Sequence, residues 1–251
     1  GLGPYLDPLT IDAVVQGLVK DNPLLRVAAL QALEPAPVDI RVQLAFPALS
    51  DPVRAVRIEA ARLLAALPAG DLPTEQRSQL EKGLEEYIKA QEVMAERPQA
   101  QVNLGNLYAA RAETGAAINA YRNAIELNPT FAPAYVNYAD LLRGQGDEEK
   151  AEAVLRRAVA LIPENGDVHH ALGLSLVRQN HTAKAVEKLE LAAKLSPDNA
   201  RYVYVYAVAL NSIGKTAQAI RVLQEAHNRF PNNTDILNAL VTFHRDKGNA
   251  T

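Results

Sequence analysis

Apolar and polar residues follow one another along this chain with the spacing of helices rather than strands. In the first such stretch the apolar side chains recur every three or four residues, at Ile11, Val14, Val15, Leu18 and Val19, which places them on one helical face. Asp21-Asn22-Pro23 ends this helix. The same pattern predicts helices over residues 24–33, 38–49, 53–67 and 75 to about 97. Pro47 lies inside the second of these and predicts a kink there.

From residue 98 onward the pattern repeats with a fixed period of 34 residues. The repeating prolines are Pro129, Pro163, Pro197 and Pro231. Alanines keep the same spacing in two further series, Ala117, Ala151, Ala185, Ala219 and Ala124, Ala158, Ala192, Ala226. A fixed period in this range is typical of stacked supersecondary units, because neither helix of one unit can bury its apolar face alone. We therefore predict an all-α fold, a solenoid of stacked antiparallel helical hairpins.

The four copies, 98–131, 132–165, 166–199 and 200–233, resemble tetratricopeptide repeats. Residues matching the first signature pair of that family are Leu104-Gly105, Tyr138-Ala139, Leu172-Gly173 and Tyr206-Ala207. Large residues follow at Tyr108, Leu142, Leu176 and Leu210, and again at Tyr121, Leu155, Leu189 and Leu223. The early tryptophan position departs from the family, with Gln101, Tyr135, His169 and Val203. The resemblance implies a right-handed superhelix whose first helices line a concave surface that holds peptides or partner helices.

Small residues have specific expected roles in these hairpins. Gly173 should lie against the second helix of its own hairpin, where a large side chain would overpack, whereas Gly166 is expected in a boundary loop that tolerates alanine. The residues expected to end the first helices in the left-handed conformation are Gly146, Asn180, Gly214 and Gly248.

The N-terminal helices form a different array. Residues 46–67 read FPALSDPVRAVRIEAARLLAAL, which resembles a HEAT repeat: a proline in the first helix, an Asp-Pro turn, then Val-Arg and small alanines. Arg57 lies 31 residues after Arg26, at the equivalent place of an earlier hairpin. We predict HEAT-like hairpins over 1–67, a linker and joining helix over 68–97, four tetratricopeptide repeats over 98–233 and a terminal half-repeat over 234–251.

The terminal half-repeat lacks a second helix. We interpret it as a cap or as the end of an excised piece, since the chain begins at Gly1 without methionine. Its apolar residues are Ile236, Leu237, Leu240, Val241 and Phe243. With no following helix to cover them fully, they predict self-association or a missing downstream segment.

Composition narrows the possible functions. The chain has 251 residues, a net charge of −3 and no cysteine, so it lacks the basic footprint of a nucleic-acid binder and cannot form disulfides or thiolate metal sites. No apolar run approaches 18 residues, and membrane insertion is not expected. None of the five histidines has metal-ligand spacing; for the adjacent His169 and His170 a surface or groove position is favoured over a ligand role. No catalytic constellation or phosphate loop is present, and we expect neither enzymatic activity nor a cofactor.

The candidate binding surface lies on the first helices of the tetratricopeptide array. By repeat position, its residues are Asn106, Val136, Asp140, Arg143, His170, Leu174, Arg201, Tyr204, Val208 and Asn211. Leu174, Tyr204 and Val208 are apolar or aromatic where a purely solvated face would favour charge, and exposed rows of this kind mark contacts. The arginines favour a partner with acidic or amide side chains. The alternative, that these positions form only the solvated face of each helix, stays open.

A carboxylate clamp like that of tetratricopeptide co-chaperones is not expected. Asn106 and Asn137 occupy two places of the clamp, but Val102 replaces its first lysine, and Asp167 and Ala171 replace its final basic pair. A bound carboxylate would therefore meet a like charge.

The leading hypothesis is a non-enzymatic scaffold that binds a peptide or partner polypeptide along the concave face. The alternative is the docking or assembly region of a larger enzyme or electron-transfer protein, because the order of repeats resembles the C-terminal half of bacterial multihaem cytochrome proteins. That alternative implies a periplasmic or extracellular location, and the leading hypothesis a soluble, cytoplasmic protein. A third reading, binding of single-stranded RNA, is disfavoured by the acidic charge balance.

Overall fold

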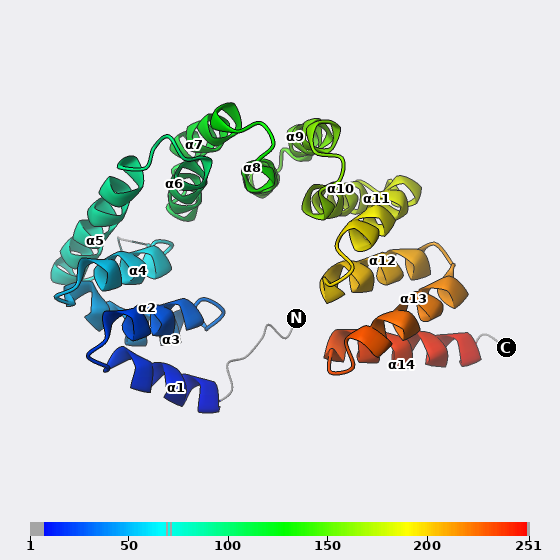
Figure 1. The fold of residues 1–251 in the computed structure, drawn as a ribbon, viewed down its shortest axis with the longest axis horizontal. Helices are drawn as coiled ribbons and strands as arrows, with labels where there is room; N and C mark the ends of the chain where they lie inside the picture. The colour runs from blue at the N-terminus through cyan, green and yellow to red at the C-terminus, as the bar shows by residue number, and fades with distance from the viewer. Residues whose placement is uncertain (1–7, 69, 71, 250–251) are drawn as a thin grey trace. The chain divides into compact units, whose positions relative to one another are not determined.

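The computed structural model describes residues 8–68, 70 and 72–249, in which all regular secondary structure is helical. This confirms the predicted all-α class of stacked helical hairpins. The chain divides into two compact units, Gly1–Leu127 (unit 1) and Asn128–Thr251 (unit 2). Figure 1 shows successive helices packed side by side within each unit. The boundaries predicted from sequence for the individual arrays stay predictions.

Unit 1 contains the N-terminal array and the first predicted repeat. Its helices are α1 (Pro8–Leu18), α2 (Pro23–Ala32), α3 (Val38–Ala45), the 3₁₀ helix η1 (Phe46–Ser50), α4 (Arg54–Leu64), α5 (Thr74–Glu92), α6 (Pro98–Ala110) and α7 (Thr114–Leu127). The α-helix predicted over 38–49 ends at Ala45 and continues as a 3₁₀ helix from Phe46, next to Pro47, which lacks the amide donor of an α-helical bond. Helix α5 ends five residues before the predicted position. Residues 93–96 form turns, and Arg97, which precedes Pro98, is extended.

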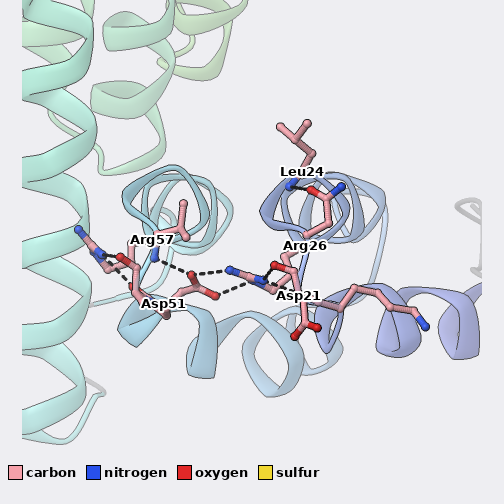
Figure 2. Close-up of polar contacts among 9 residues, drawn as sticks. Asp21, Leu24, Arg26, Asp51 and Arg57 are labelled. Carbon is pink, nitrogen blue, oxygen red and sulfur yellow. Dashed lines mark hydrogen bonds and ion pairs between the residues drawn. The ribbon is translucent and has the colours of Figure 1, made fainter.

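Arg26 ties the first hairpin of unit 1 to the second. Its Nε and Nη2 atoms donate to the two carboxylate oxygens of Asp51 at 2.8 and 3.1 Å, and its Nη1 donates to the carbonyls of Lys20 and Asp21 (Figure 2). The side chains of Arg26 and Asp51 are only 13% and 11% exposed. One arginine therefore closes its own turn and anchors the next one.

Arg57 repeats this arrangement one hairpin later (Figure 2). Its Nη1 donates to the carbonyls of Asp51 and Pro52 at 2.8 and 3.1 Å, while Nε and Nη2 bind the Glu86 carboxylate at 2.9 and 2.8 Å. The pairing raises the pKa of Arg57 and lowers that of Glu86. The contacts of Arg26 and Arg57 are equivalent, as their spacing in the sequence suggests.

Unit 2 contains the remaining repeats. Its helices are α8 (Ala132–Gly144), α9 (Glu148–Leu161), α10 (Gly166–Arg178), α11 (Thr182–Leu195), α12 (Ala200–Ser212), α13 (Thr216–Arg229) and α14 (Thr234–Asn249). A Cβ atom on Gly173 would lie 2.7 Å from Leu189 of α11, which confirms that this glycine packs against the second helix of its hairpin. The prediction for Gly166 is wrong. It is buried at the start of α10, and a Cβ atom there would overlap the Ser196 hydroxyl.

Left-handed residues end the first helices at a common repeat position. Gly146, Asn180 and Gly214 have φ angles of 81°, 61° and 77°, as predicted. In the first repeat Ala112 takes this place with φ 58°, a conformation that costs an L-residue free energy. Gly248 does not end its helix, because α14 continues to Asn249. The glycine at this fifth position was therefore misread as a helix end.

The variable tryptophan position has a shared structural role. Gln101 donates to the Ala95 carbonyl at 2.9 Å, Tyr135 to the Pro129 carbonyl at 2.9 Å, and Nε2 of His169 lies 2.7 Å from the Pro163 carbonyl. Each residue thus satisfies the carbonyl six positions earlier, between two hairpins. His169 is accordingly buried and not at the surface or in a groove.

The fourth residue in this series, Val203, has no polar group for the task. The equivalent carbonyl, that of Pro197, instead accepts from Nη1 of Arg229 at 3.0 Å. Arg229 comes from the end of α13, so a different element supplies the missing donor.

Helix α14 is better covered than its sequence suggests. Ile236, Leu240 and Phe243 are buried in one cluster with residues of α12 and α13, while Leu237 and Val241 are 46% and 61% exposed. The expected uncovered face is thus reduced to two side chains. Among the described helices, none has the length and apolar character needed to cross a membrane.

Candidate functional site

A pocket of about 470 Å³ lies in unit 2, where the first helices α8, α10 and α12 follow one another. Five of the ten predicted surface residues line it: Val136, Asp140, His170, Leu174 and Arg201. The other lining residues are Pro133, Asn137, Ala139, Ala151, Leu155, Asp167, Ala171, Arg178, Asn199 and Tyr202. The lining combines aliphatic side chains with charged and amide groups. Such a combination is characteristic of sites that bury a small part of a ligand and orient it by a few polar contacts.

One side of the pocket is built by a stacked pair of rings. His170 of α10 and Tyr202 of α12 lie with ring centroids 4.2 Å apart and planes inclined by 19°. The Tyr202 hydroxyl donates to Oδ1 of Asp167 at 2.7 Å. Burial and this bond to a carboxylate raise the pKa of Tyr202. Two successive repeats are therefore joined by a stack and a charge-assisted hydrogen bond, which together hold the His170 ring in place.

His170 is uncharged at neutral pH. The residue is 7% exposed, and its Nδ1 atom is buried without a hydrogen-bond partner among the described residues. Burial lowers its pKa to about 4; the nearby Arg201 charge acts in the same direction and Asp167 opposes it. His170 lines the pocket, to which its ring contributes a neutral polar group.

Most charges of the pocket already have partners. Arg178 binds Glu148 at 2.9 Å, and both this arginine and Ser175 lower the pKa of the Glu148 carboxyl. Asp140 pairs with Arg143 at 3.4 Å. Arg201 is exposed and forms no salt bridge with any described residue. Among the described pocket residues, Arg201 is therefore a guanidinium without a carboxylate partner, and Asp167 is a carboxylate whose partner is the neutral Tyr202 hydroxyl.

The other predicted surface residues lie outside this pocket. Arg143 is exposed beside Asp140, and Val208 is 39% exposed on α12. Tyr204 is partly buried against the cluster that includes α13 and α14. Asn211 accepts a hydrogen bond from Thr216 at 2.7 Å.

Asn106 belongs to unit 1, where it accepts from the Tyr121 hydroxyl at 2.8 Å. It lines a separate pocket of about 380 Å³ in that unit, together with Arg62. Arg62 is paired with Glu34 and Glu59, each at 2.8 Å, and these hydrogen bonds raise its pKa. The charge of Arg62 is thus compensated within the protein.

Tyr202 is the main site residue that sequence reasoning missed. The equivalent positions one and two repeats earlier are Val168 and Ala134, both fully buried, so the period assigns this position to the core. Asp167 was considered only as an obstacle to a carboxylate clamp. The only feature of the sequence that could have pointed to Tyr202 is its neighbour Arg201, which was predicted to belong to the binding surface.

Metal binding has no support in the described residues. No three His, Asp or Glu side chains in the part of the chain that the structure describes gather closely enough to hold a metal ion. Of the adjacent histidines, His169 points its Nε2 atom at a carbonyl, whereas His170 stacks on Tyr202.

Two protein-family models match the chain. The tetratricopeptide repeat model matches residues 108–174, and the model of subunit 3 of the anaphase-promoting complex, or cyclosome, matches residues 144–226. No curated protein sequence is significantly similar to the chain.

Several solved structures have a similar fold. Yeast Tom70 superimposes with a TM-score of 0.62 at 17% identity, over 95% of this chain and 46% of Tom70. The Cut9–Hcn1 hetero-tetramer of the APC/C gives 0.52 at 14% identity, over 94% of this chain and 46% of the matched one. A MamA protein gives 0.51 at 17% identity, over 60% of this chain and 82% of MamA. This chain spans about half the length of the first two, and identities this low show the fold alone.

Proposed function

We propose that the chain, whose residues 108–174 match the tetratricopeptide repeat model, is a non-enzymatic scaffold that holds a partner polypeptide in the pocket of unit 2. The observation that carries the proposal is the pocket itself, which residues of three successive first helices line together with Ala151 and Leu155 of α9. First helices are the elements that the repeat resemblance assigns to the binding face.

The chemistry of the lining supports a polypeptide partner. Val136 and Leu174 offer apolar area for side chains, while Asn137, Asn199 and Arg201 offer polar groups that can bind main-chain or side-chain atoms. The volume of about 470 Å³ accommodates a few residues of an extended segment rather than a folded domain. We assign the five pocket residues among the predicted ten to the partner-binding surface.

The remaining predicted residues extend this surface in the proposal. Arg143 and Val208 are exposed on α8 and α12, so a longer partner segment can reach them. Asn106 is a weaker assignment, since it lines a different pocket in unit 1. The similarity of the chain to a subunit of the APC/C hetero-tetramer, an assembly of several chains, is consistent with a role in protein association.

We also propose that the hairpins of residues 1–67 are HEAT-like. Equivalent contacts of Arg26 and Arg57, each closing its own turn and binding a carboxylate beyond it, support two related units. In this proposal they form a structural extension of the repeat array that carries the binding pocket.

The proposal can be tested without a known partner. A display library of random twelve-residue peptides is selected on the full chain, and the enriched peptides are synthesised and titrated by fluorescence polarisation. Leu174→Glu, which places a charge among the apolar lining, should weaken binding at least tenfold. Val177→Glu is the matched control on the same helix, because Val177 is 41% exposed and does not line the pocket. Equal affinities of the two variants would refute the pocket as the binding site.

A further inference from the structure

The two ring nitrogens of His170 have different surroundings. Nδ1 is buried without a partner, whereas Nε2 is not among the buried unpartnered atoms and makes no hydrogen bond within the described protein. Nε2 is therefore the nitrogen that solvent reaches. A neutral imidazole has one N–H donor and one acceptor. Because an orphaned buried N–H is less well tolerated than an orphaned acceptor, the proton belongs on Nε2.

This donor is held in place before any ligand arrives. The His170 ring stacks on Tyr202, and Tyr202 is fixed in turn by its hydroxyl bond to Asp167. A donor with a fixed direction loses little conformational entropy when it binds an acceptor. His170 thus offers a preorganised N–H group at the pocket.

The charged groups that face His170 are Arg201 and Asp167. Asp167 is occupied by the Tyr202 hydroxyl, while Arg201 has no salt-bridge partner among the described residues. The Tyr202 hydroxyl is neutral, so Asp167 keeps its negative charge beside the ring. The two groups that can donate to a ligand at this place are Nε2–H of His170, which is neutral, and the guanidinium of Arg201, which is cationic. Charge-assisted bonds from an arginine to a carboxylate are the strongest of this kind.

Within the function proposed above, we propose that the pocket selects a partner segment by one acidic side chain, whose carboxylate pairs with Arg201 and accepts a hydrogen bond from Nε2–H of His170. A lysine or arginine at the same place would meet the Arg201 charge. A glutamine could accept both bonds through its carbonyl oxygen, but without a negative charge these bonds would be weaker, and the guanidinium would stay uncompensated. The residues involved are not those of a carboxylate clamp, whose positions here hold Val102, Asp167 and Ala171.

The tautomer of His170 tests the first half of the inference in the free protein. Long-range ¹H–¹⁵N correlation spectra of the full chain with ¹⁵N-labelled histidine distinguish the two neutral forms, and the His170 signals are assigned by their loss in His170→Gln. At pH 7 the Nε2–H form is expected. The Nδ1–H form, or a charged ring, would overturn the proposed donor.

Peptide selection tests the second half. Peptides selected on the wild-type chain should share an aspartate or glutamate at one position, and selection on Arg201→Glu should replace it by lysine or arginine. Changing that acidic residue to its amide should weaken wild-type binding about tenfold. His170→Leu should cause a similar loss, whereas His170→Gln, which keeps an N–H donor near the place of Nε2, should retain most of the affinity.

The outcomes separate the two proposals. If the same consensus is selected by the wild-type chain and by Arg201→Glu, the acidic specificity is wrong although the groove still binds peptides. If neither protein enriches any peptide, the proposed function fails and the specificity with it. Circular dichroism of each variant confirms that it is folded before its affinity is interpreted.

Discussion

Mild acid should destabilise the protein through His170. The ring is 7% exposed and its pKa is about 4 in the folded chain, against an ordinary value of 6.5. Between these values the unfolded chain binds a proton that the folded chain does not accept. The stabilising effect of the neutral ring is therefore complete above pH 6.5 and is lost as the pH falls towards 4. Each pH unit within this window lowers the free energy of unfolding by about 1.4 kcal/mol, which gives about 3 kcal/mol over the whole window.

The measurement is urea denaturation followed by circular dichroism at a series of pH values from 7 to 4. His170→Gln keeps a neutral polar side chain without a titrating ring, so its free energy of unfolding should fall by about 3 kcal/mol less than that of the wild type across the series. The carboxylates titrate equally in both proteins, and their contribution cancels in the difference.

His169 provides a second comparison. Burial also lowers its pKa, but the Pro163 carbonyl opposes this effect. His169→Gln should therefore retain the part of the acid sensitivity that comes from His170. Parallel profiles for the wild type and His170→Gln would show that the folded ring accepts a proton normally, and the description of its buried, unpartnered Nδ1 would be wrong.

Three substitutions test the fold by the same denaturation measurement at pH 7. Asp51→Ala should lower the free energy of unfolding by about 3 kcal/mol, because it leaves the nearly buried Arg26 without its carboxylate. Asp246→Ala, which removes an exposed ion pair, is the control. Similar small effects of both substitutions would refute a structural role of the Arg26 contact. Ala112→Gly should raise it by about 0.5–1 kcal/mol, since relief of the left-handed conformation exceeds the entropic cost of glycine, and destabilisation would count against the φ of 58°. Gly173→Leu should lower it by about 1–3 kcal/mol through overpacking against Leu189, and a neutral effect would contradict the repeat register.

Much of the architecture was predictable because each repeat position has a local task. Gly146, Asn180 and Gly214 end their helices in the left-handed conformation, and Gly173 packs on its own hairpin, as the 34-residue period indicates. The same reasoning failed for Gly248, where the helix simply continues to its last described residue.

The candidate site was only half predictable. The 34-residue period pointed to His170 and Arg201, because equivalent positions of successive first helices lie on the same face of the array. Both residues line the pocket. It did not single out Tyr202, whose equivalents Val168 and Ala134 are buried in the core. A large ring at that position reaches instead towards the preceding repeat, where it stacks on His170.

The sequence by itself determined the helices, their period and the residues that join the two helices of a hairpin, because these contacts depend on neighbours at fixed spacing. The tertiary structure decided what happens between hairpins. Arg229 supplies the hydrogen bond that Val203 cannot make to the Pro197 carbonyl, and Tyr202 joins its ring to His170. Such contacts pair non-equivalent positions of different repeats. A side chain is selected for such a contact by its length and by the presence of a backbone group that still lacks a hydrogen bond. Both conditions arise only when the hairpins are stacked.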